Sequence, residues 1–275
     1  MYKGFNLENI SKKDLLIKTD KNKSFEEYNY SNFKQIEKNL NSFILNGGSI
    51  KAKEIQNDWF PDIKADIFIS HSHKDEELAI NFGNWLFTNF GLKSFIDSTV
   101  WKYSKDLLNK ILSNNDTYIH KRNTDGVTYK YNETLNMSSH IDMILSTSII
   151  KMIDNCECLF FLNTPNSINE TDAIENETYS QWIYLETYIS SIINKKEPNR
   201  SSQESFYFSD TIKYDANIEH LHKLTNLELK NWLDLYNDKK TNNQLDDFQN
   251  SFNKYNPLDI LYEYIGKNNK TIRSN

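Results

Sequence analysis

The stretch WFPDIKADIFISHSHKDEE, residues 59–77, carries the strongest fold signal in the chain. Residues 66–70 form a short apolar run after Pro61, which is typical of a buried strand. Ser72 and Asp75 have the spacing of a helix-capping box, so a helix should follow directly. The apolar stripe of this helix has helical spacing and consists of Leu78, Phe82, Trp85 and Leu86. Gly91 suits the position just past the end of the helix. The stretch therefore predicts a strand that runs into a helix, with a domain boundary near residue 60.

Further strands and helices continue this alternation. LKSFID (residues 92–97) and the continuous apolar run CECLFFLNTP (156–165) are predicted strands. Helical spacing is seen over residues 139–154 and again over 180–192, and ESFYFSDTIKYDANI (204–218) should hold one or two more short strands. Such an alternation builds a parallel sheet with helices on both faces. The expected fold class is therefore α/β, and ligands in such folds bind beyond the carboxyl ends of the strands.

Three segments lie outside this alternation. Residues 1–60 predict a helical N-terminal extension, because four apolar residues share one helical face: Phe33, Ile36, Leu40 and Phe43. Residues 61–224 are the expected main domain, with a long polar insertion at about 98–139 that should contain a short helix and a loop or hairpin over 114–134. Residues 225–275 carry scattered leucines and aromatic residues, which indicates a C-terminal extension of two or three amphipathic helices.

The composition is that of a polar, globular protein. The 275 residues have a mean hydropathy of −0.71, a formal net charge of −6 and no dense cluster of Lys and Arg, which argues against direct nucleic-acid binding. The first residues lack the apolar core of a signal peptide, and no run approaches the roughly 20 apolar residues of a spanning helix. With two cysteines and no disulfide framework, we expect a cytoplasmic protein that does not act at a membrane.

Motifs for metals and for several common enzyme classes are missing from the sequence. Cys156 and Cys158 are two apart in a predicted strand, so they should face the same side and serve as small core residues. Two H-x-H pairs begin at His71 and His220, but no H-E-x-x-H and no Cys/His set at zinc spacing accompanies them. No G-x-S-x-G, P-loop or G-x-G-x-x-G motif occurs among only 7 glycines, so serine-hydrolase, Walker and Rossmann sites lack their backbone requirements.

The segment SQWIYLETYIS, residues 180–190, should form the helix after the third strand. Thr178 and Gln181 can close a capping box at its start. Its buried stripe is expected to consist of Trp182, Leu185, Ile189 and Ile192. One carboxylate, Glu186, lies in this otherwise aromatic, β-branched or hydroxylic run.

Glu186 follows Trp182 by four residues, so the two share a helical face. At the margin of the stripe, its carboxylate should be half-buried beside an indole. Desolvation raises the pKa of a buried carboxyl unless hydrogen-bond donors meet it, and Ser180, Tyr184 and Thr187 are the candidate donors. The helix alone leaves two interpretations open: a functional carboxylate, or an edge glutamate that extends to solvent or pairs with a lysine.

Polar residues stand where the predicted strands end. Ser70, His71 and Ser72 come at the end of the first strand, Asp97 at the end of the second and Asn163 at the end of the third. Because the carboxyl ends of parallel strands lie at one edge of a sheet, these side chains should converge on one rim. Each also has a purely structural explanation, since Ser72 can cap a helix and Asp97 can start a turn.

Four segments resemble a bacterial Toll/interleukin-1 receptor (TIR) domain in their order and spacing: DIFISHSHKDEELA, GLKSFID, ECLFFLNTPNS and the S-x-W-x-x-x-E pattern that ends at Glu186. The resemblance covers roughly residues 62–220 and implies a flavodoxin-like fold. It also implies cleavage of the nicotinamide N-glycosidic bond of NAD, by an NAD glycohydrolase or an ADP-ribosyl cyclase that uses NAD as its substrate and needs no cofactor. Glu186 would then be the catalytic carboxylate.

The resemblance also implies the surroundings of the site. The substrate-binding residues would be Ser70, His71, Ser72, Asp97, Trp101 and Trp182. The loop after Asp97 corresponds to a loop that gates the site and contacts a neighbouring copy, although it is much longer here, and Ile183 stands where a cysteine often follows the tryptophan. Members commonly become active on self-association, and bacterial ones often serve antiphage defence, with an activating partner or with an effector that reads the product.

Two other functions stay open at this point. One is a TIR scaffold or adaptor without catalytic activity, which the family also contains. The other is an enzyme that resembles nucleoside deoxyribosyltransferases, which share the flavodoxin-like architecture and use a glutamate nucleophile in N-glycosidic chemistry. The F-I-S-H-S turn at residues 68–72 favours the TIR interpretation over this last one.

Overall fold

The computed structural model describes residues 1–15, 64–96, 108–109, 111–113, 118–123, 126–168, 178, 180–198, 218–244 and 256–272 of the chain. Its main sheet contains the strands β1 (Lys3–Glu8), β2 (Ile67–Ser70), β3 (Ser94–Ile96), β6 (Cys158–Asn163) and β7 (His222–Leu224). The helices that cover it are α3 (Glu76–Phe90), α5 (Tyr131–Asn155), α6 (Gln181–Ile192), α7 (Asn226–Gln244) and α8 (Pro257–Ile272). Among the described residues, no helix is both long and apolar enough to cross a membrane.

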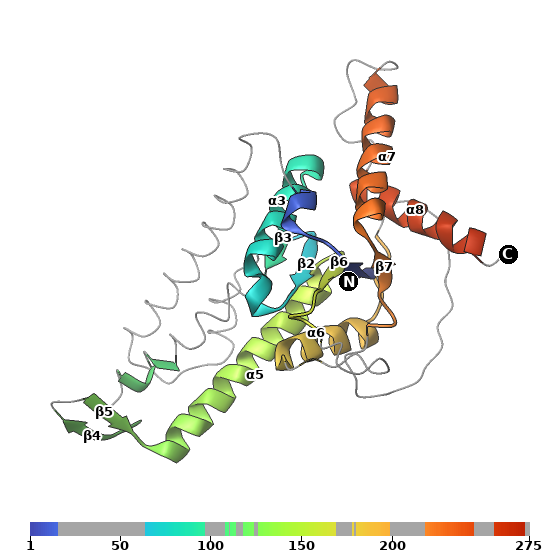
Figure 1. Ribbon diagram of the computed structural model, residues 1–275. Helices are drawn as coiled ribbons and strands as arrows, with labels where there is room; N and C mark the ends of the chain where they lie inside the picture. Colours follow the sequence, from blue (N-terminus) through green and yellow to red (C-terminus); the bar gives the residue numbers. More distant parts are fainter. Residues whose placement is uncertain are drawn as a thin grey trace.

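The five strands form one parallel sheet in the order β3-β2-β6-β1-β7 (Figure 1). This confirms the predicted α/β class and the strands predicted at 66–70, 92–97 and 156–165. Counted from β2, the order β3-β2-β6 is the 2-1-3 start of a flavodoxin-like sheet. The fourth place, beside β6, is taken by β1 from the start of the chain.

The position of β1 corrects the prediction of a helical extension over residues 1–60. Lys3–Glu8 is a strand inside the sheet, paired with β6 on one side and β7 on the other. Phe5 and Leu7 are fully buried against one face, so a period of two is present in KGFNLE but is only two apolar residues long. Such a short signal gains its stability from the neighbouring strands. The helical face predicted within residues 33–43 lies outside the described residues.

One face of the sheet is covered by α3, α7 and α8. Phe160 of β6 is fully buried here and lies 4.8 Å from Phe5 and 5.3 Å from Phe82, measured between ring centroids. Helix α3 ends at Gly91, which has a left-handed φ of 71° and donates its N–H to Phe87 O, as the sequence predicts. Of the two or three helices predicted after residue 225, α7 and α8 are confirmed, and both contribute residues to this core.

The other face is covered by α5 and α6, which pack against each other. Helix α5 begins at Tyr131, inside the predicted insertion, and extends away from the sheet toward the antiparallel hairpin of β4 (Ile119–Asn123) and β5 (Gly126–Tyr129) (Figure 1). The hairpin was one of two conformations predicted for residues 114–134. The strands predicted within 204–217 lie outside the described residues, whereas the short strand β7 was not predicted.

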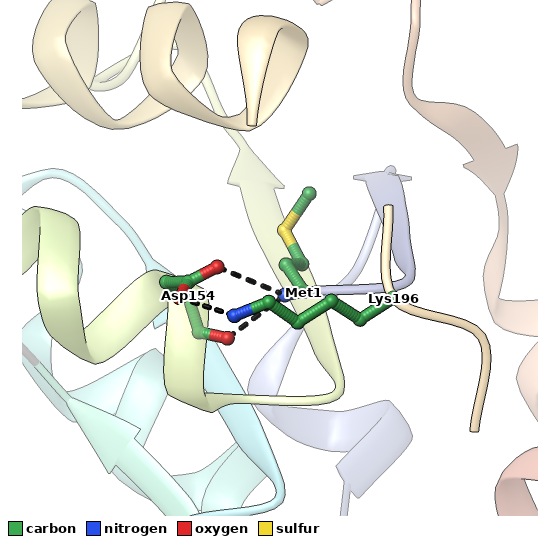
Figure 2. Close-up of polar contacts among 3 residues, drawn as sticks. All are labelled: Met1, Asp154 and Lys196. Carbon is green, nitrogen blue, oxygen red and sulfur yellow. Dashed lines mark hydrogen bonds and ion pairs between the residues drawn. The ribbon is translucent and has the colours of Figure 1, made fainter. Parts of the chain in front are cut away.

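The amino end of β1 is fixed by an ionic contact (Figure 2). The α-amine of Met1 donates to Asp154 O at 2.9 Å and lies 3.8 Å from Asp154 Oδ1, while Lys196 pairs with the other carboxylate oxygen. Burial lowers the pKa of the amine, and the negative charge of Asp154 opposes that change. Helix α5, strand β1 and the segment after α6 are therefore joined at one point.

Gly4 of β1 packs directly against the side chain of Leu221. A Cβ atom at position 4 would lie closer to Leu221 Cδ2 than van der Waals contact allows, and Leu221 is 4% exposed. We expect Gly4→Ala to lower the free energy of unfolding in urea by about 1–3 kcal/mol, because an added methyl group strains a packed core. Combining it with Leu221→Ala should recover part of that loss. Strictly additive effects of the two substitutions would show that the two side chains do not compete for space.

We expect His222 to make the stability of the folded protein depend on pH. Burial lowers the pKa of its imidazole to about 4, and the positive charges of Lys3 and Lys195 act in the same direction. Below its ordinary value of 6.5, the unfolded chain therefore takes up a proton that the folded chain does not. Stability should fall as the pH drops from 6.5 toward about 4, by about 3 kcal/mol in total.

Urea unfolding across that pH range tests this expectation. His222→Gln cannot titrate, so its stability should fall less steeply with decreasing pH than that of the wild type. The same substitution at the exposed His73 is the control and should keep the wild-type slope. An unchanged slope in His222→Gln would mean that other groups set the acid sensitivity.

Candidate active site

The candidate site lies where the strand order reverses. Strand β2 ends at Ser70 and its neighbour β6 ends at Asn163, yet the chain passes through β3 and α5 between them. The helices that follow β2 and β6, α3 and α6, lie on opposite faces of the sheet. In parallel α/β sheets, this reversal leaves a crevice at the carboxyl ends of the two strands, where ligands bind.

Helix α6 presents a polar face to the interior. Its buried residues are Ile183, Glu186, Thr187, Ile189 and Ser190. The predicted stripe is therefore wrong in part, because Ile192 is 59% exposed and Trp182 and Leu185 are only partly buried. The hydroxyl of Thr187 donates to Ile183 O at 2.7 Å and that of Ser190 donates to Thr187 O at 2.8 Å. Local bonds of this kind satisfy the hydroxyls within the helix and allow this face to be buried.

The start of α6 also differs from the prediction. Ser180 is the N-cap, and its hydroxyl accepts from Ile183 N at 3.3 Å. The hydroxyl of Thr178 accepts from Ser180 N at 3.2 Å, so it supports the turn before the helix and does not cap it. A cap at Ser180 fixes the rotation of the first turn, and with it the direction in which Glu186 points.

Glu186 is fully buried, with 0% of its surface exposed, where the sequence predicted a half-buried side chain. Ser70 Oγ donates a hydrogen bond of 2.5 Å to Glu186 Oε2, across 116 positions of sequence. A hydrogen bond from a hydroxyl to a carboxylate is short and strong because the acceptor is charged. The prediction placed Ser70 and Glu186 at one site, but it named Ser180, Tyr184 and Thr187 as donors. Ser180 and Thr187 are used within the helix instead.

The residues after β2 lie beside this pair. His71 is 3% exposed, and its Nδ1 lies 3.3 Å from Ile69 O. Ser72 is 8% exposed and caps the short helical turn η3 (His73–Asp75), accepting from Lys74 N. Ser72 therefore caps a helical turn, which was the structural explanation given for it from the sequence. Ser70 and His71 are buried at the carboxyl edge of the sheet.

The loops after β2 and β6 are bonded to each other. Thr164 Oγ1 donates to Asp75 Oδ2 at 2.5 Å, and Asn166 Nδ2 donates to Asp75 Oδ1 at 2.8 Å. Ser167 Oγ donates to Leu162 O at 2.8 Å and holds the second loop against its own strand. These bonds join the segment after β2 to the segment after β6 at the carboxyl edge of the sheet.

Three other predicted substrate-binding residues have different outcomes. Trp182 is partly buried and packs against the core under α5 and α6. Asp97 and Trp101 lie outside the described residues, so their part in the site stays a prediction. The structure also shows two polar residues on β1 that the sequence analysis did not single out, Asn6 and Glu8. The period of two in KGFNLE is too short a signal to have revealed them.

The two cysteines are separated by the sheet, which corrects the prediction that they face the same side. Cys156 follows α5 and packs beneath that helix, whereas Cys158 opens β6 and faces the α3 side. Burial raises the pKa of the Cys156 thiol to about 12 and also raises that of Cys158. Both side chains therefore remain protonated and act as small core residues.

The histidine pairs do not assemble a metal centre in the described part of the chain. His220 Nε2 lies 2.7 Å from Ser190 Oγ, whereas His222 lies in β7 against Phe5. Among the described residues, no group of three or more His, Cys, Asp or Glu side chains is placed to hold a metal ion.

Comparisons of the chain with protein-family models, with curated proteins and with solved structures find no match. Any inference about the function of the chain therefore has to be drawn from its sequence, its fold and its site. The fold is a five-stranded parallel α/β sheet, and the site is a buried carboxylate that accepts from a serine at its reversal point.

Proposed function

We propose that the chain is an enzyme of the TIR class that cleaves the nicotinamide N-glycosidic bond of NAD. The observation that carries the proposal is Glu186, a fully buried carboxylate that accepts from Ser70 at the carboxyl edge of the sheet. Burying a charge in this way costs stability, so a role in chemistry explains why the chain keeps it there. The resemblance of residues 62–220 to TIR domains supports NAD as the substrate.

Cleavage breaks the bond between C1′ of the ribose and the nicotinamide nitrogen. The bonding electron pair leaves with nicotinamide, which departs as a neutral base and needs no strong general acid. The ribose then carries developing positive charge in an oxocarbenium-like transition state, as in glycoside hydrolysis. A fixed carboxylate beside C1′ stabilises that charge, and more strongly in a buried site than in water.

Ser70 acts on this step through Glu186. Its hydroxyl donates to Oε2 and holds the carboxylate in one orientation. The cation at C1′ is consumed either by water, which adds its oxygen and releases a proton, or by a nitrogen of the adenine, which closes a ring. The first route gives ADP-ribose and the second gives a cyclic isomer. Self-association and a role in antiphage defence belong to the same proposal and rest on the resemblance alone.

The test is nicotinamide release from NAD by concentrated protein, with and without a crowding agent that favours assembly. A parallel series offers free nucleosides with an acceptor base. We expect nicotinamide release that increases on assembly, and no base exchange. Base exchange without NAD cleavage would identify a nucleoside deoxyribosyltransferase-like enzyme. If protein that is shown to be assembled catalyses neither reaction, the scaffold function is the one that remains.

A further inference from the structure

The carboxyl end of β1 places a second polar group on the α6 side of the sheet. In the strand register, Ser70 lies opposite Phe161, Phe161 lies opposite Asn6, and one step further out Asn163 lies opposite Glu8. Phe5 and Leu7 face the opposite core, so alternation turns Asn6 and Glu8 toward the face of Ser70. With about 4.8 Å between neighbouring strands, Asn6 lies about 10 Å from Ser70 along this row.

Asn6 has a buried acceptor that nothing in the described part of the chain satisfies. The residue is 1% exposed, its Nδ2 donates to Glu8 Oε1 at 2.9 Å, and its Oδ1 has no hydrogen-bond partner among the described residues. The orientation of the amide is fixed, because an ionised carboxylate only accepts and Nδ2 must face it. A buried acceptor without a donor is costly, and a ligand that supplies an O–H or N–H would satisfy this one.

Glu8 supplies further acceptors beside Asn6. Its side chain is 28% exposed, and Lys223 Nζ of β7 lies 3.2 Å from Oε1. The lysine is itself 75% exposed, so this ion pair is weak, and the carboxylate oxygens can still accept hydrogen bonds from a ligand. Asn6 and Glu8 together present acceptors and negative charge, which suits hydroxyl groups and repels a phosphate.

We propose that Asn6 and Glu8 bind the hydroxyl groups of the second sugar of a dinucleotide, the adenosine ribose, and thereby select NAD over NADP. This inference rests on the proposed function, which places the nicotinamide ribose at Glu186. A dinucleotide anchored there would cross β6 over the buried Phe161 before its other ribose reaches β1. Carboxylates beyond parallel strands bind the ribose 2′-hydroxyl of NAD in other α/β folds. A 2′-phosphate would meet the Glu8 carboxylate, which discriminates by repulsion.

The test measures binding of NAD and of NADP by calorimetry to full-length Glu186→Gln, which should not cleave either ligand. The same background then carries Glu8→Gln, Asn6→Leu or Ser94→Ala. Asn6→Leu keeps the shape of the side chain and removes the orphan acceptor. Ser94 is the matched control, because it is 1% exposed and its hydroxyl lacks a hydrogen-bond partner among the described residues, but it lies at the amino end of β3.

We expect NAD to bind at least about 10-fold more tightly than NADP, because one hydrogen bond is gained and one repulsion is avoided. Glu8→Gln should bring the two affinities to within about twofold, because an uncharged side chain no longer repels the phosphate. Asn6→Leu should weaken NAD binding by about 10-fold without lowering the unfolding temperature, a result that a merely structural asparagine would not give. Ser94→Ala should change neither affinity.

Two outcomes would overturn the inference, and they are distinguishable. NAD binding that persists with an unchanged NAD preference in Glu8→Gln and Asn6→Leu would overturn the role of β1 and leave the proposed function intact. No binding of either dinucleotide to the assembled Glu186→Gln protein would overturn both.

Discussion

Glu186→Gln is expected to reduce nicotinamide release from NAD by about 100- to 1,000-fold or more, with little effect on folding. Glutamine keeps the shape of the side chain and can still accept from Ser70 Oγ, but it removes the charge that we propose stabilises the ribose cation. Since burying a carboxylate is costly, the free energy of unfolding should stay the same or rise. Loss of rate without loss of stability would distinguish a catalytic carboxylate from a structural one.

Glu197→Gln is the matched control for that variant. Glu197 lies just beyond α6, is exposed, and undergoes the same change of charge. Its nicotinamide release and its unfolding midpoint in urea should equal those of the wild type. Equal loss of rate in both variants would trace the effect to net charge, and equal rates in Glu186→Gln and the wild type would contradict the role of Glu186.

Trp232→Ala should lower the free energy of unfolding by about 3–5 kcal/mol, the range for a large aromatic residue removed from a core. Trp232 of α7 is fully buried and stacks on Phe90 of α3 with 4.0 Å between ring centroids. Its Nε1 donates to Pro257 O at the start of α8 at 2.9 Å. One side chain thus joins α3, α7 and α8 on one face of the sheet.

Trp232→Phe separates the two contributions of this side chain. Phenylalanine keeps most of the stacking and loses the hydrogen bond, so its cost should be smaller, on the order of 1–2 kcal/mol. Leu235→Ala is the control on the same helix, because Leu235 is 38% exposed and should change stability by less than about 1 kcal/mol. A cost below about 1 kcal/mol for Trp232→Ala would mean that α7 and α8 are not part of the core.

Local signals in the sequence predict the elements around β2 well. The run at residues 66–70, the glycine at 91 and the apolar run at 156–165 each act within a few residues, so they can be read without knowledge of the fold. Strand β1 could not be read in this way. Its pairing with β6 and β7 joins segments more than 150 positions apart, and only the complete sheet makes it a strand.

The site was predicted in part for the same reason. Strand ends and the helix placed Ser70 and Glu186 together, because the carboxyl ends of parallel strands share one edge. The rotation of α6 was misjudged, since Thr187 and Ser190 count as polar in a stripe although their hydroxyls bond to the helix's own carbonyls. Asn6 and Glu8 were missed with β1. Each error arose where tertiary contacts, and not local sequence, decide which face is buried.

We propose that NAD is cleaved beside Glu186, at the reversal point between β2 and β6. A crystal structure of assembled Glu186→Gln with NAD tests it most directly. We expect C1′ of the nicotinamide ribose within about 3–3.5 Å of the side chain at position 186, the separation of reacting groups. NAD bound away from residue 186 and Ser70, for example at the amino ends of the strands, would contradict it.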